Sequence, residues 1–478
     1  MPVNSTHPQY DSHFSQWQRC RDAVDGSDAI KSRGDQYLPK LSEQDSDEYK
    51  AYQKRALWYG ASARTIQGLT GAVMRKEPAV EAATALDEHL KDVTLTGISF
   101  QAFAKTTLEE VLKTGRYGVL VDMPAVTHDT QRPYYAAYTG ESIVNWRTVI
   151  VNGIPKLVLV VLCEQLWDPK PDDAYTMECI EQYRVLRLHD NRYEVETYRQ
   201  SKETDQDWVS QGLVLPMFRG ARLDYIPFCF FGPNTITPDI EKPPILDLVE
   251  VNLSHFRTSA DLEHGAHFCG LPTPWVAGFP ENKVLKIGSS VAWVSNDKDA
   301  KAGMLEFTGQ GLGALETRLK EKQSQMAVLG ARLLEEAKPA VEAADTLSMR
   351  FSGEQSVLRS VAGSVSTGLS KLLEWAGLWS GVSPEEAKKA VATLNTDFMD
   401  AQMTFAELTQ LVSAWQSGAI SYETMYYNMQ RGEVTRPGIE AEEERQLIDI
   451  QKGAPDEGTD PNADPNAPLP EDQQKEAA

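Results

Sequence analysis

Cysteine is scarce in this chain of 478 residues, and the few cysteines form no recognisable pattern. The five are Cys20, Cys163, Cys179, Cys229 and Cys269. Their number is odd and no CxxC pair occurs, which argues against a disulfide framework and against a structural zinc site. We expect five reduced, mostly buried thiols in a reducing compartment.

No stretch of the chain is apolar for long enough to cross a bilayer. The longest purely apolar run is seven residues, from Leu157 to Cys163, whereas a membrane-spanning helix needs about 20. The N-terminal residues, Met1 to Phe14, are polar and lack the charged-then-apolar pattern of a secretory signal. The sequence therefore predicts a soluble, intracellular protein that has no membrane partner.

Basic residues are fewer than acidic ones. The chain has 47 Lys and Arg and 69 Asp and Glu, which give a formal charge of -22. Such a surface repels nucleic-acid phosphates, so tight, sequence-specific DNA binding is not expected. The same charge remains compatible with a protein past which DNA slides without sticking.

Catalytic signatures are absent, and the nearest glycine motif is incomplete. The chain contains no GxSxG, no HRD-like loop and no dense cluster of acids. Gly309, Gly311 and Gly313 have the spacing GxGxG rather than GxGxxG. This spacing favours a flexible strand-to-helix joint over a dinucleotide-binding loop.

Two further motifs have ordinary structural interpretations. Gly363 and Gly368 have the spacing of a P-loop, but Leu369 occupies the place of the phosphate-binding lysine. Small residues that allow close helix packing are the better interpretation. HxxHxC at 264–269 would need a distant fourth ligand to hold a metal. We interpret its histidines as groups at the end of a helix. We predict that the chain binds no metal and no cofactor and that it is not an enzyme.

Apolar periodicity predicts a mixed front part and a helical back part. Helices are predicted over 52–73, 100–113, 245–268, 312–338, 356–379, 384–395, 405–417 and 422–430. Strands are predicted over 117–122, 146–151, 156–162, 183–188, 192–198 and 225–231, with a small β patch at 283–307. Asn152-Gly153 predicts a hairpin turn. Strands and helices do not alternate, so the predicted fold class is α+β.

Two of the predicted helices carry one apolar stripe each. The first stripe is Leu246, Val249, Leu253 and Phe256. The second stripe is Leu312, Leu315, Leu319, Met326, Leu329 and Leu333. Both helices are otherwise polar or of mixed charge, and a helix of this kind is stable only where neighbours cover its stripe.

The order of these parts, together with short local motifs, carries a family resemblance. The motifs are YLPKL at 37–41, YQKRALWYGASARTIQGLTGAVMRKEP at 52–78 and TGRYGVLVDMP at 114–124. They are similar to a subfamily of portal proteins of tailed bacteriophages that was long filed as an uncharacterised domain. The similarity extends over about 35–440 and includes two long helices on either side of a small β module.

The resemblance implies a portal-like division of the chain. Its parts would be a mixed wing at 1–240, a first stem helix at 241–269, a clip at 270–311, a second stem helix at 312–338, a tunnel loop at 339–352, a tunnel helix at 353–379, small C-terminal wing or crown helices at 380–452, and a disordered acidic tail at 453–478. The tail is too polar to bury a core of its own.

The resemblance also implies a function. Portal proteins form rings of about twelve subunits at one capsid vertex, and the stem helices of neighbouring subunits pack on one another in a contact that closes. Double-stranded DNA passes through the ring during genome packaging and ejection. The expected partners are the major capsid protein, a scaffold, the large terminase subunit and a head-tail adaptor. The expected location is the virion, after assembly in the host cytoplasm.

Particular residues follow from the same division. Lys338 and Arg350 flank the expected tunnel loop, and these two, with Arg318 and Lys322 of the second stem helix, are the predicted DNA-channel residues. The predicted docking surface of the clip is Trp275, Phe279 and Trp293. Two alternatives stay open: another virion structural protein, such as a head-tail connector or minor capsid protein, and an enzyme that uses the glycine or histidine motifs.

Overall fold

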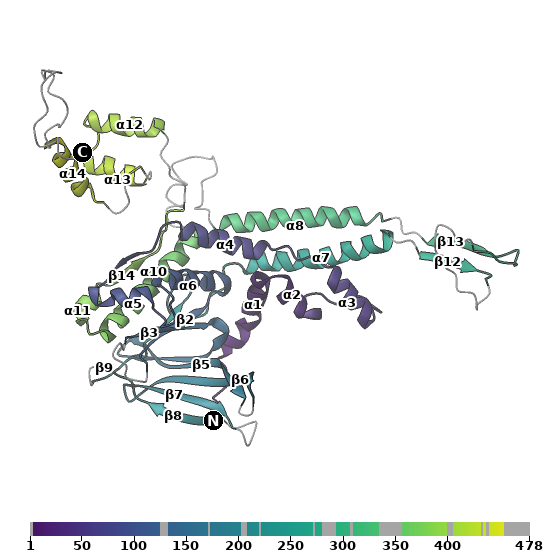
Figure 1. The fold of residues 1–478 in the computed structure, drawn as a ribbon, viewed down its shortest axis with the longest axis horizontal. Coiled ribbons are helices and arrows are strands. Elements are labelled where there is room, and N and C mark those ends of the chain that lie inside the picture. The colour runs from purple at the N-terminus through teal and green to yellow at the C-terminus, as the bar shows by residue number, and fades with distance from the viewer. Residues whose placement is uncertain are drawn as a thin grey trace, which may run out of the picture. The chain divides into compact units, whose positions relative to one another are not determined.

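A computed structural model describes most of the chain. The described residues are 3–124, 132–170, 173–201, 208–218, 221–270, 273–279, 293–305, 309–333, 356–398, 405–431, 434–435 and 439–453. The chain divides into two compact units, Met1–Phe398 and Met399–Ala478. The first unit combines helices with antiparallel sheets (Figure 1), which confirms the predicted α+β class.

Short helices begin the first unit. They are α1 (Pro8–Asp25), α2 (Ser27–Ser32), η1 (Gly34–Gln36), α3 (Ser46–Arg55) and α4 (Ala61–Val73). The single helix predicted over 52–73 is wrong, because 56–60 are not helical. In this break the Trp58 ring meets Phe256 edge-on, with ring centroids 5.9 Å apart. A contact with a distant helix therefore outweighs the local helical pattern.

A three-stranded sheet and helix α6 form the centre of the first unit. The elements of this region are β1 (Ala79–Glu81), η2 (Thr84–Leu86), α5 (Asp87–Lys91), α6 (Phe100–Thr114), β2 (Tyr117–Asp122), β3 (Tyr134–Thr139) and β11 (Phe228–Phe231). The sheet order is β11-β2-β3. Helix α6 is confirmed, and it ends as expected at Gly115, whose φ of 68° is the left-handed conformation of a C-cap.

A five-stranded antiparallel sheet in the order β4-β5-β6-β7-β8 follows. Its strands are β4 (Ile143–Val151), β5 (Ile154–Lys170), β6 (Asp173–His189), β7 (Arg192–Gln200) and β8 (Trp208–Val214), preceded by η3 (Gly140–Ser142) and followed by β9 (Met217–Phe218) and β10 (Ala221–Arg222). Asn152 and Gly153 both have positive φ and form the predicted tight turn. Asp190 and Asn191 form a second such turn. Strands β5 and β6 are much longer than predicted.

The main core joins helix α10 (Val357–Trp379), which packs against α6 and the β11-β2-β3 sheet, to helix α7 (Leu246–Gly270), which packs against α1, α3 and α4. Close helix packing predicted for the small residues of α10 is confirmed at Gly368. A Cβ atom added there would lie 2.2 Å from Cε1 of the Phe231 ring. Close packing is not seen at Gly363, because an added Cβ atom there would have no neighbour within 4 Å.

The helix predicted over 384–395 is wrong after its first turn. Helix α11 (Pro384–Ala387) is short, and the chain then forms β14 (Val391–Thr393). Strand β14 pairs antiparallel with β1, Val80 lying opposite Ala392. Ala392 is only 1% exposed. The partner strand lies more than 300 residues earlier in the chain, so a local sequence window cannot detect it. Pairing with this strand overrides the local helical preference.

One buried arginine links the sheets to the segment that leads into α7. The Arg116 guanidinium lies over the rings of Trp146 and Phe230, at 4.5 and 4.4 Å. Its Nη1 donates to the Pro238 carbonyl at 2.7 Å. Burial lowers the pKa of Arg116 to about 9. These contacts give Arg116 a structural role in the interior, because a side chain so deeply buried does not contact solvent or DNA.

The second unit contains three helices within its described residues. They are α12 (Phe405–Gln416), α13 (Tyr422–Arg431) and α14 (Ala441–Gly453). Met425 and Tyr426 of α13 are buried. The tail was predicted over 453–478; Gly453 is the last residue of α14, and the rest lies outside the described residues. In the described parts of both units, no helix combines the length and apolar character that a membrane crossing requires.

Candidate functional site

The candidate site is an antiparallel helix pair with a β-hairpin between its two helices in the chain. Helix α7 packs along α8 (Leu312–Arg332) (Figure 1). Lys322 contacts Ser254, and Gly330 lies near Leu248. Gly265, near the other end of α7, lies against Leu312. The structure therefore contains the two long helices predicted around a β module, with α7 beginning at Leu246 and α8 described to Arg332.

The apolar stripe of α7 lies inside the chain's own core. Leu246, Val249, Leu253 and Phe256 are 8%, 0%, 1% and 0% exposed. Helices α1, α3 and α4 pack on this side of α7. These four residues were predicted as contacts with a neighbouring subunit. The structure corrects that assignment, because side chains covered by their own chain are not available to a second copy.

The stripe of α8 is less completely covered. Met326 is buried, at 2% exposed. The other five predicted residues are half-buried: Leu312, Leu315, Leu319, Leu329 and Leu333. Val328, which was not predicted, is 50% exposed. Helix α8 therefore has one side on α7 and retains apolar surface that its own chain does not fill.

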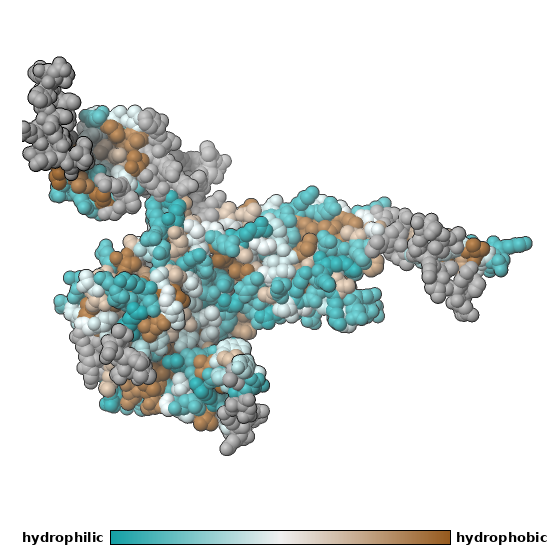
Figure 2. All heavy atoms as spheres, in the orientation of Figure 1, coloured by the Kyte–Doolittle hydropathy of each residue, from teal (hydrophilic) through white to brown (hydrophobic). Residues whose placement is uncertain are grey.

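A shallow groove of about 380 Å³ collects this apolar surface. It is lined by Val251, Ser324, Gln325, Val328 and Leu329, so both helices contribute to it. Figure 2 shows apolar colour along the exposed side of the helix pair, between hydrophilic residues. The groove is open and contains no charged side chain among its lining residues. It is suited to an apolar side chain or helix rather than to a charged ligand.

Of the basic residues predicted on α8, Lys322 has a contact within the chain. Its Nζ donates to the Ser254 carbonyl at 3.0 Å and to Thr258 Oγ1. Burial lowers its pKa, and the charges of Arg318 and Arg257 act in the same direction. Lys322 thus fastens α8 to α7. Its predicted contact with DNA stays a prediction.

Arg318 is exposed and has an acidic neighbour. Its Nη1 lies 3.4 Å from Oε2 of Glu321, one turn along α8, and the two side chains are 71% and 52% exposed. A solvated pair of this kind contributes little to stability. The pairing leaves Arg318 as an exposed but charge-compensated group. The predicted contact with DNA stays a prediction.

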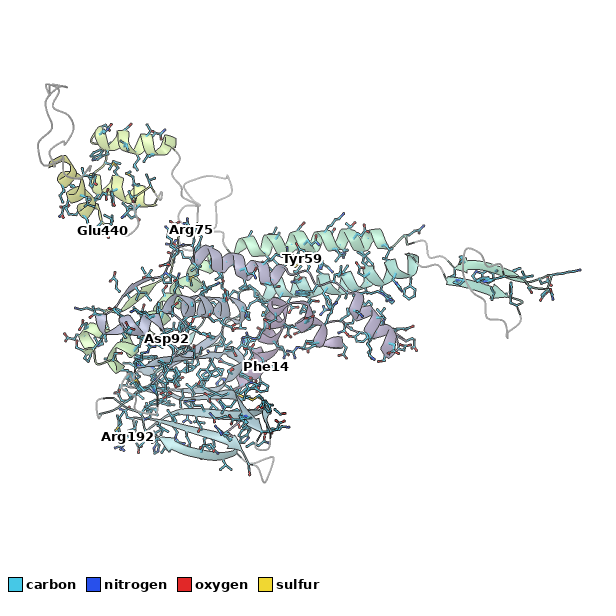
Figure 3. All side chains as sticks on the ribbon, in the orientation of Figure 1. Phe14, Tyr59, Arg75, Asp92, Arg192 and Glu440 are labelled. Carbon is cyan, nitrogen blue, oxygen red and sulfur yellow. The ribbon has the colours of Figure 1, made fainter. Side chains whose placement is uncertain are left out.

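His255 makes the interior of the helix pair polar at one point. It is 5% exposed, and its ring lies against Tyr59, with centroids 5.3 Å apart (Figure 3 labels Tyr59). Its Nε2 is 3.3 Å from Nε2 of Gln323. Burial lowers the pKa of His255, and the Lys322 ammonium lowers it further. The neutral imidazole is the form that this environment favours.

The histidines of the HxxHxC motif have partners within the chain. His264 meets Tyr52 edge-on with centroids 5.2 Å apart, and His267 Nε2 lies 2.9 Å from a guanidinium nitrogen of Arg55. Cys269 lies beside Gly309, whose φ is 63°. The residues that the structure describes contain no group of three or more potential metal ligands. These contacts support the structural interpretation of the motif.

The hairpin between the helices consists of β12 (Thr273–Ala277) and β13 (Lys301–Leu305). Trp275 is 45% exposed, and its ring packs over Gly303, where an added Cβ would lie 2.9 Å from Nε1. Met304 and Leu305 point to opposite faces and are 52% and 51% exposed. Both faces therefore carry uncovered apolar side chains. A two-stranded hairpin of this kind is marginally stable alone.

The other predicted clip and channel residues are only partly observed. Phe279 and Trp293 are half-buried and belong to neither strand. The strand predicted over 283–287, and the tunnel loop with Lys338 and Arg350, lie outside the described residues. Helix α10 begins at Val357, close to the predicted start of the tunnel helix.

Sequence reasoning missed the exposed apolar groups at the two ends of the five-stranded sheet. Ile150 and Ile154 are 78% and 69% exposed at one end, and Trp167 and Tyr175 are 62% and 98% exposed at the other. The available signal was alternation that continues past the predicted strand limits, up to Lys170 in β5.

One family model matches the part of the chain that contains the helix pair. A family model described as "Domain of unknown function (DUF4055)" matches residues 244–380, which include α7, β12, β13, α8 and α10. A search of curated proteins finds no match.

Two solved structures are similar to the chain at low scores. One is described as "Neck of empty GTA particle computed with C6 symmetry"; the identity is 11%, the match covers 84% of this chain and 97% of the other, and the TM-score is 0.36. The other is described as "Neck of native GTA particle computed with C12 symmetry", with 10% identity, 83% and 97% coverage and a TM-score of 0.36.

Proposed function

We propose that this chain is a portal-type subunit, which assembles with further copies into a closed ring that conducts double-stranded DNA at a capsid vertex. In this role it would act in genome packaging and ejection, without catalytic chemistry, and would dock a terminase motor and later a head-tail adaptor. The observation that carries the proposal is the helix pair: α7 is anchored in the core, whereas α8 and the hairpin present apolar surface that the chain leaves uncovered.

The uncovered surface fits contacts between identical subunits. In the groove, Val328 is 50% exposed and Leu329 is half-buried. Burying such side chains contributes about 1 kcal/mol or more each. A ring places the same groove beside the same partner surface at every subunit boundary, so one modest contact is repeated until the ring closes.

The hairpin fits a docking role at the end of the helix pair. Trp275, Met304 and Leu305 are each about half exposed. Aromatic and Met side chains are enriched at the centres of protein interfaces. A partner that covers both faces would supply the stability that two strands lack by themselves. A motor or adaptor protein at the end of the ring is a partner of this kind.

The charge of the chain fits a conduit better than a binding site. The formal charge is -22, and on α8 the exposed Arg318 is compensated by Glu321. A channel wall that repels phosphates weakly does not trap DNA at any point along its path. Tight phosphate binding would oppose translocation, because every bound phosphate must be released before the duplex advances.

The test is the native mass of the full chain, together with its top view in negative stain. The expected result is a ring of about a dozen subunits with a central channel. Val328→Glu should weaken the ring, because it puts a carboxylate into the apolar groove. Ala327→Glu is the matched control, since it puts the same charge on the adjacent, exposed position outside the groove.

Three outcomes separate the possibilities. Rings that Val328→Glu disrupts and Ala327→Glu leaves intact support the proposal. A monomer that still forms no ring with capsid and scaffold proteins present contradicts it. An assembly without a channel that joins head to tail components would favour the second candidate, another virion structural protein.

A further inference from the structure

Strands β5 and β6 extend beyond the rest of the five-stranded sheet as a two-stranded ribbon. Strand β4 pairs with β5 only as far as Leu162, and β7 pairs with β6 only as far as Gln182. Beyond these points β5 and β6 pair with each other alone, up to Lys170 opposite Asp173. We call residues 163–170 and 173–181 the ribbon. Both of its edges lack a neighbouring strand among the described residues.

One face of the ribbon carries exposed apolar side chains, and the other face carries two acids. Trp167 and Met177 are 62% and 50% exposed. Asp168 lies directly opposite Glu178 in the strand register. Like charges in a cross-strand pair destabilise a sheet. No salt bridge to either acid occurs in the described part of the chain, so the repulsion is uncompensated within one copy.

The opposite end of the same sheet has the complementary character. Ile150 and Ile154, which flank the β4–β5 turn, are 78% and 69% exposed. Arg192 is exposed at this end beside the exposed Asp190, Lys156 bonds to Asn191 at 2.6 Å, and Arg147 is exposed farther along β4, opposite Leu159. Figure 3 labels Arg192 at this end of the sheet. We call Arg147, Ile150, Ile154, Lys156 and Arg192 the basic end.

The two ends cannot meet within one chain. Strand β5 runs from Ile154 at the basic end to Lys170 at the tip of the ribbon, and at about 3.3 Å per residue this separates them by about 50 Å. Paired strands are stiff over such a length. A contact between the ribbon and a basic end therefore requires two copies of the chain.

We propose that the ribbon of one copy packs on the basic end of the next copy. Cations of the basic end would then face Asp168 and Glu178, whereas Trp167 and Cys179 lie on the other face of the ribbon. The contact is head to tail, because ribbon against ribbon sets acid against acid and basic end against basic end sets cation against cation. It deepens the proposed ring by naming a subunit contact outside the helix pair, and so rests on that function.

Cys179 supplies a natural probe on the ribbon, since it is exposed and lies opposite Trp167. The full chain with Ile154→Cys is treated with a short bismaleimide and run on denaturing gels. The expected result is a ladder of dimer, trimer and higher species, because a head-to-tail contact links each copy to two others. Cys179→Ser in the same chain should remove the ladder. Leu57→Cys, at 60% exposure elsewhere, is the matched control.

Charge reversal tests the chemistry of the contact. Glu178→Lys alone and Arg192→Glu alone should each raise the concentration needed for half-assembly by about tenfold. The two changes combined in one chain should restore assembly to within a few-fold of the parent. If the single changes acted by damaging the fold, the damage would add up in the double variant and assembly would not be restored.

The outcomes distinguish this contact from the ring itself. Rings without a ladder overturn the contact and leave the ring standing. A ladder without closed rings supports the contact and contradicts the proposed ring. Crosslinked dimers alone indicate a symmetric contact, and this overturns the head-to-tail arrangement. No ladder in protein that stays monomeric also overturns it.

Discussion

Two glycines of helix α10 should respond to alanine with opposite signs. Gly363 and Gly368 both lie within the helix, and both are flanked by good contacts of α10 with the core. An added Cβ at Gly363 meets no atom within 4 Å. An added Cβ at Gly368 would lie 2.2, 2.7 and 2.8 Å from three carbons of the Phe231 ring.

The magnitudes follow from these distances. Gly→Ala inside a helix contributes about 0.5–1 kcal/mol of stability where nothing opposes it, which is the expectation for Gly363→Ala. At Gly368 the ring must move by more than an ångström to restore contact distance. Phe231 is 0% exposed and lies in β11, paired with β2. Overpacking of about 1–3 kcal/mol then outweighs the helical gain.

The assay is urea unfolding of both variants and the parent, followed by tryptophan fluorescence. Trp375 and Trp379 lie on this helix, but the chain has ten tryptophans, so the signal reports unfolding of the whole chain. Hydrogen exchange of the α10 amides gives an independent value, because the two units of the chain need not unfold together. Gly363→Ala should raise the midpoint and Gly368→Ala should lower it. Equal shifts of one sign would refute the packing argument.

Two further predictions concern a buried histidine and a lysine between helices. Burial lowers the pKa of His89 to about 4, so the unfolded chain takes up a proton near pH 6.5 while the folded chain does not. The free energy of unfolding therefore falls by about 3 kcal/mol from this group as pH falls from about 7 to 4. His89→Gln should remove this part of the pH dependence, measured as urea midpoints over a pH series. An unchanged pH dependence would contradict the prediction. Lys322→Met removes the bonds to Ser254 and Thr258 and should cost about 1 kcal/mol, seen as faster hydrogen exchange in α8; unchanged exchange would show that the lysine does not hold the helices together.

Local sequence was enough to predict the elements whose patterns are complete within one segment. Helix α6 with its Gly115 cap, the Asn152-Gly153 turn and the helix over 357–379 were predicted and are confirmed. The two long helices around a β module were also predicted from periodicity and breakers. In each case the apolar spacing and the terminating residue lie within a window of about twenty residues.

Tertiary structure decided the elements whose partners are far away in the chain. The break at 56–60 exists because Trp58 packs on Phe256, and β14 exists because β1 is there to pair with it. Neither partner is visible to a local pattern. The same holds for the bond between the Lys322 ammonium and α7, which the charge of the lysine alone does not indicate.

The sequence by itself determined the α+β class, the acidic charge, the absence of a catalytic motif and the helix–hairpin–helix order. Only the tertiary structure decided which apolar residues remain exposed. Periodicity shows that a helix has an apolar stripe, but not what covers it. The stripe of α7 is covered by the chain's own helices, whereas Val328 on α8 and Trp167 on the ribbon remain exposed. Coverage depends on segments distant in sequence, so the candidate surfaces appear only when the chain is folded.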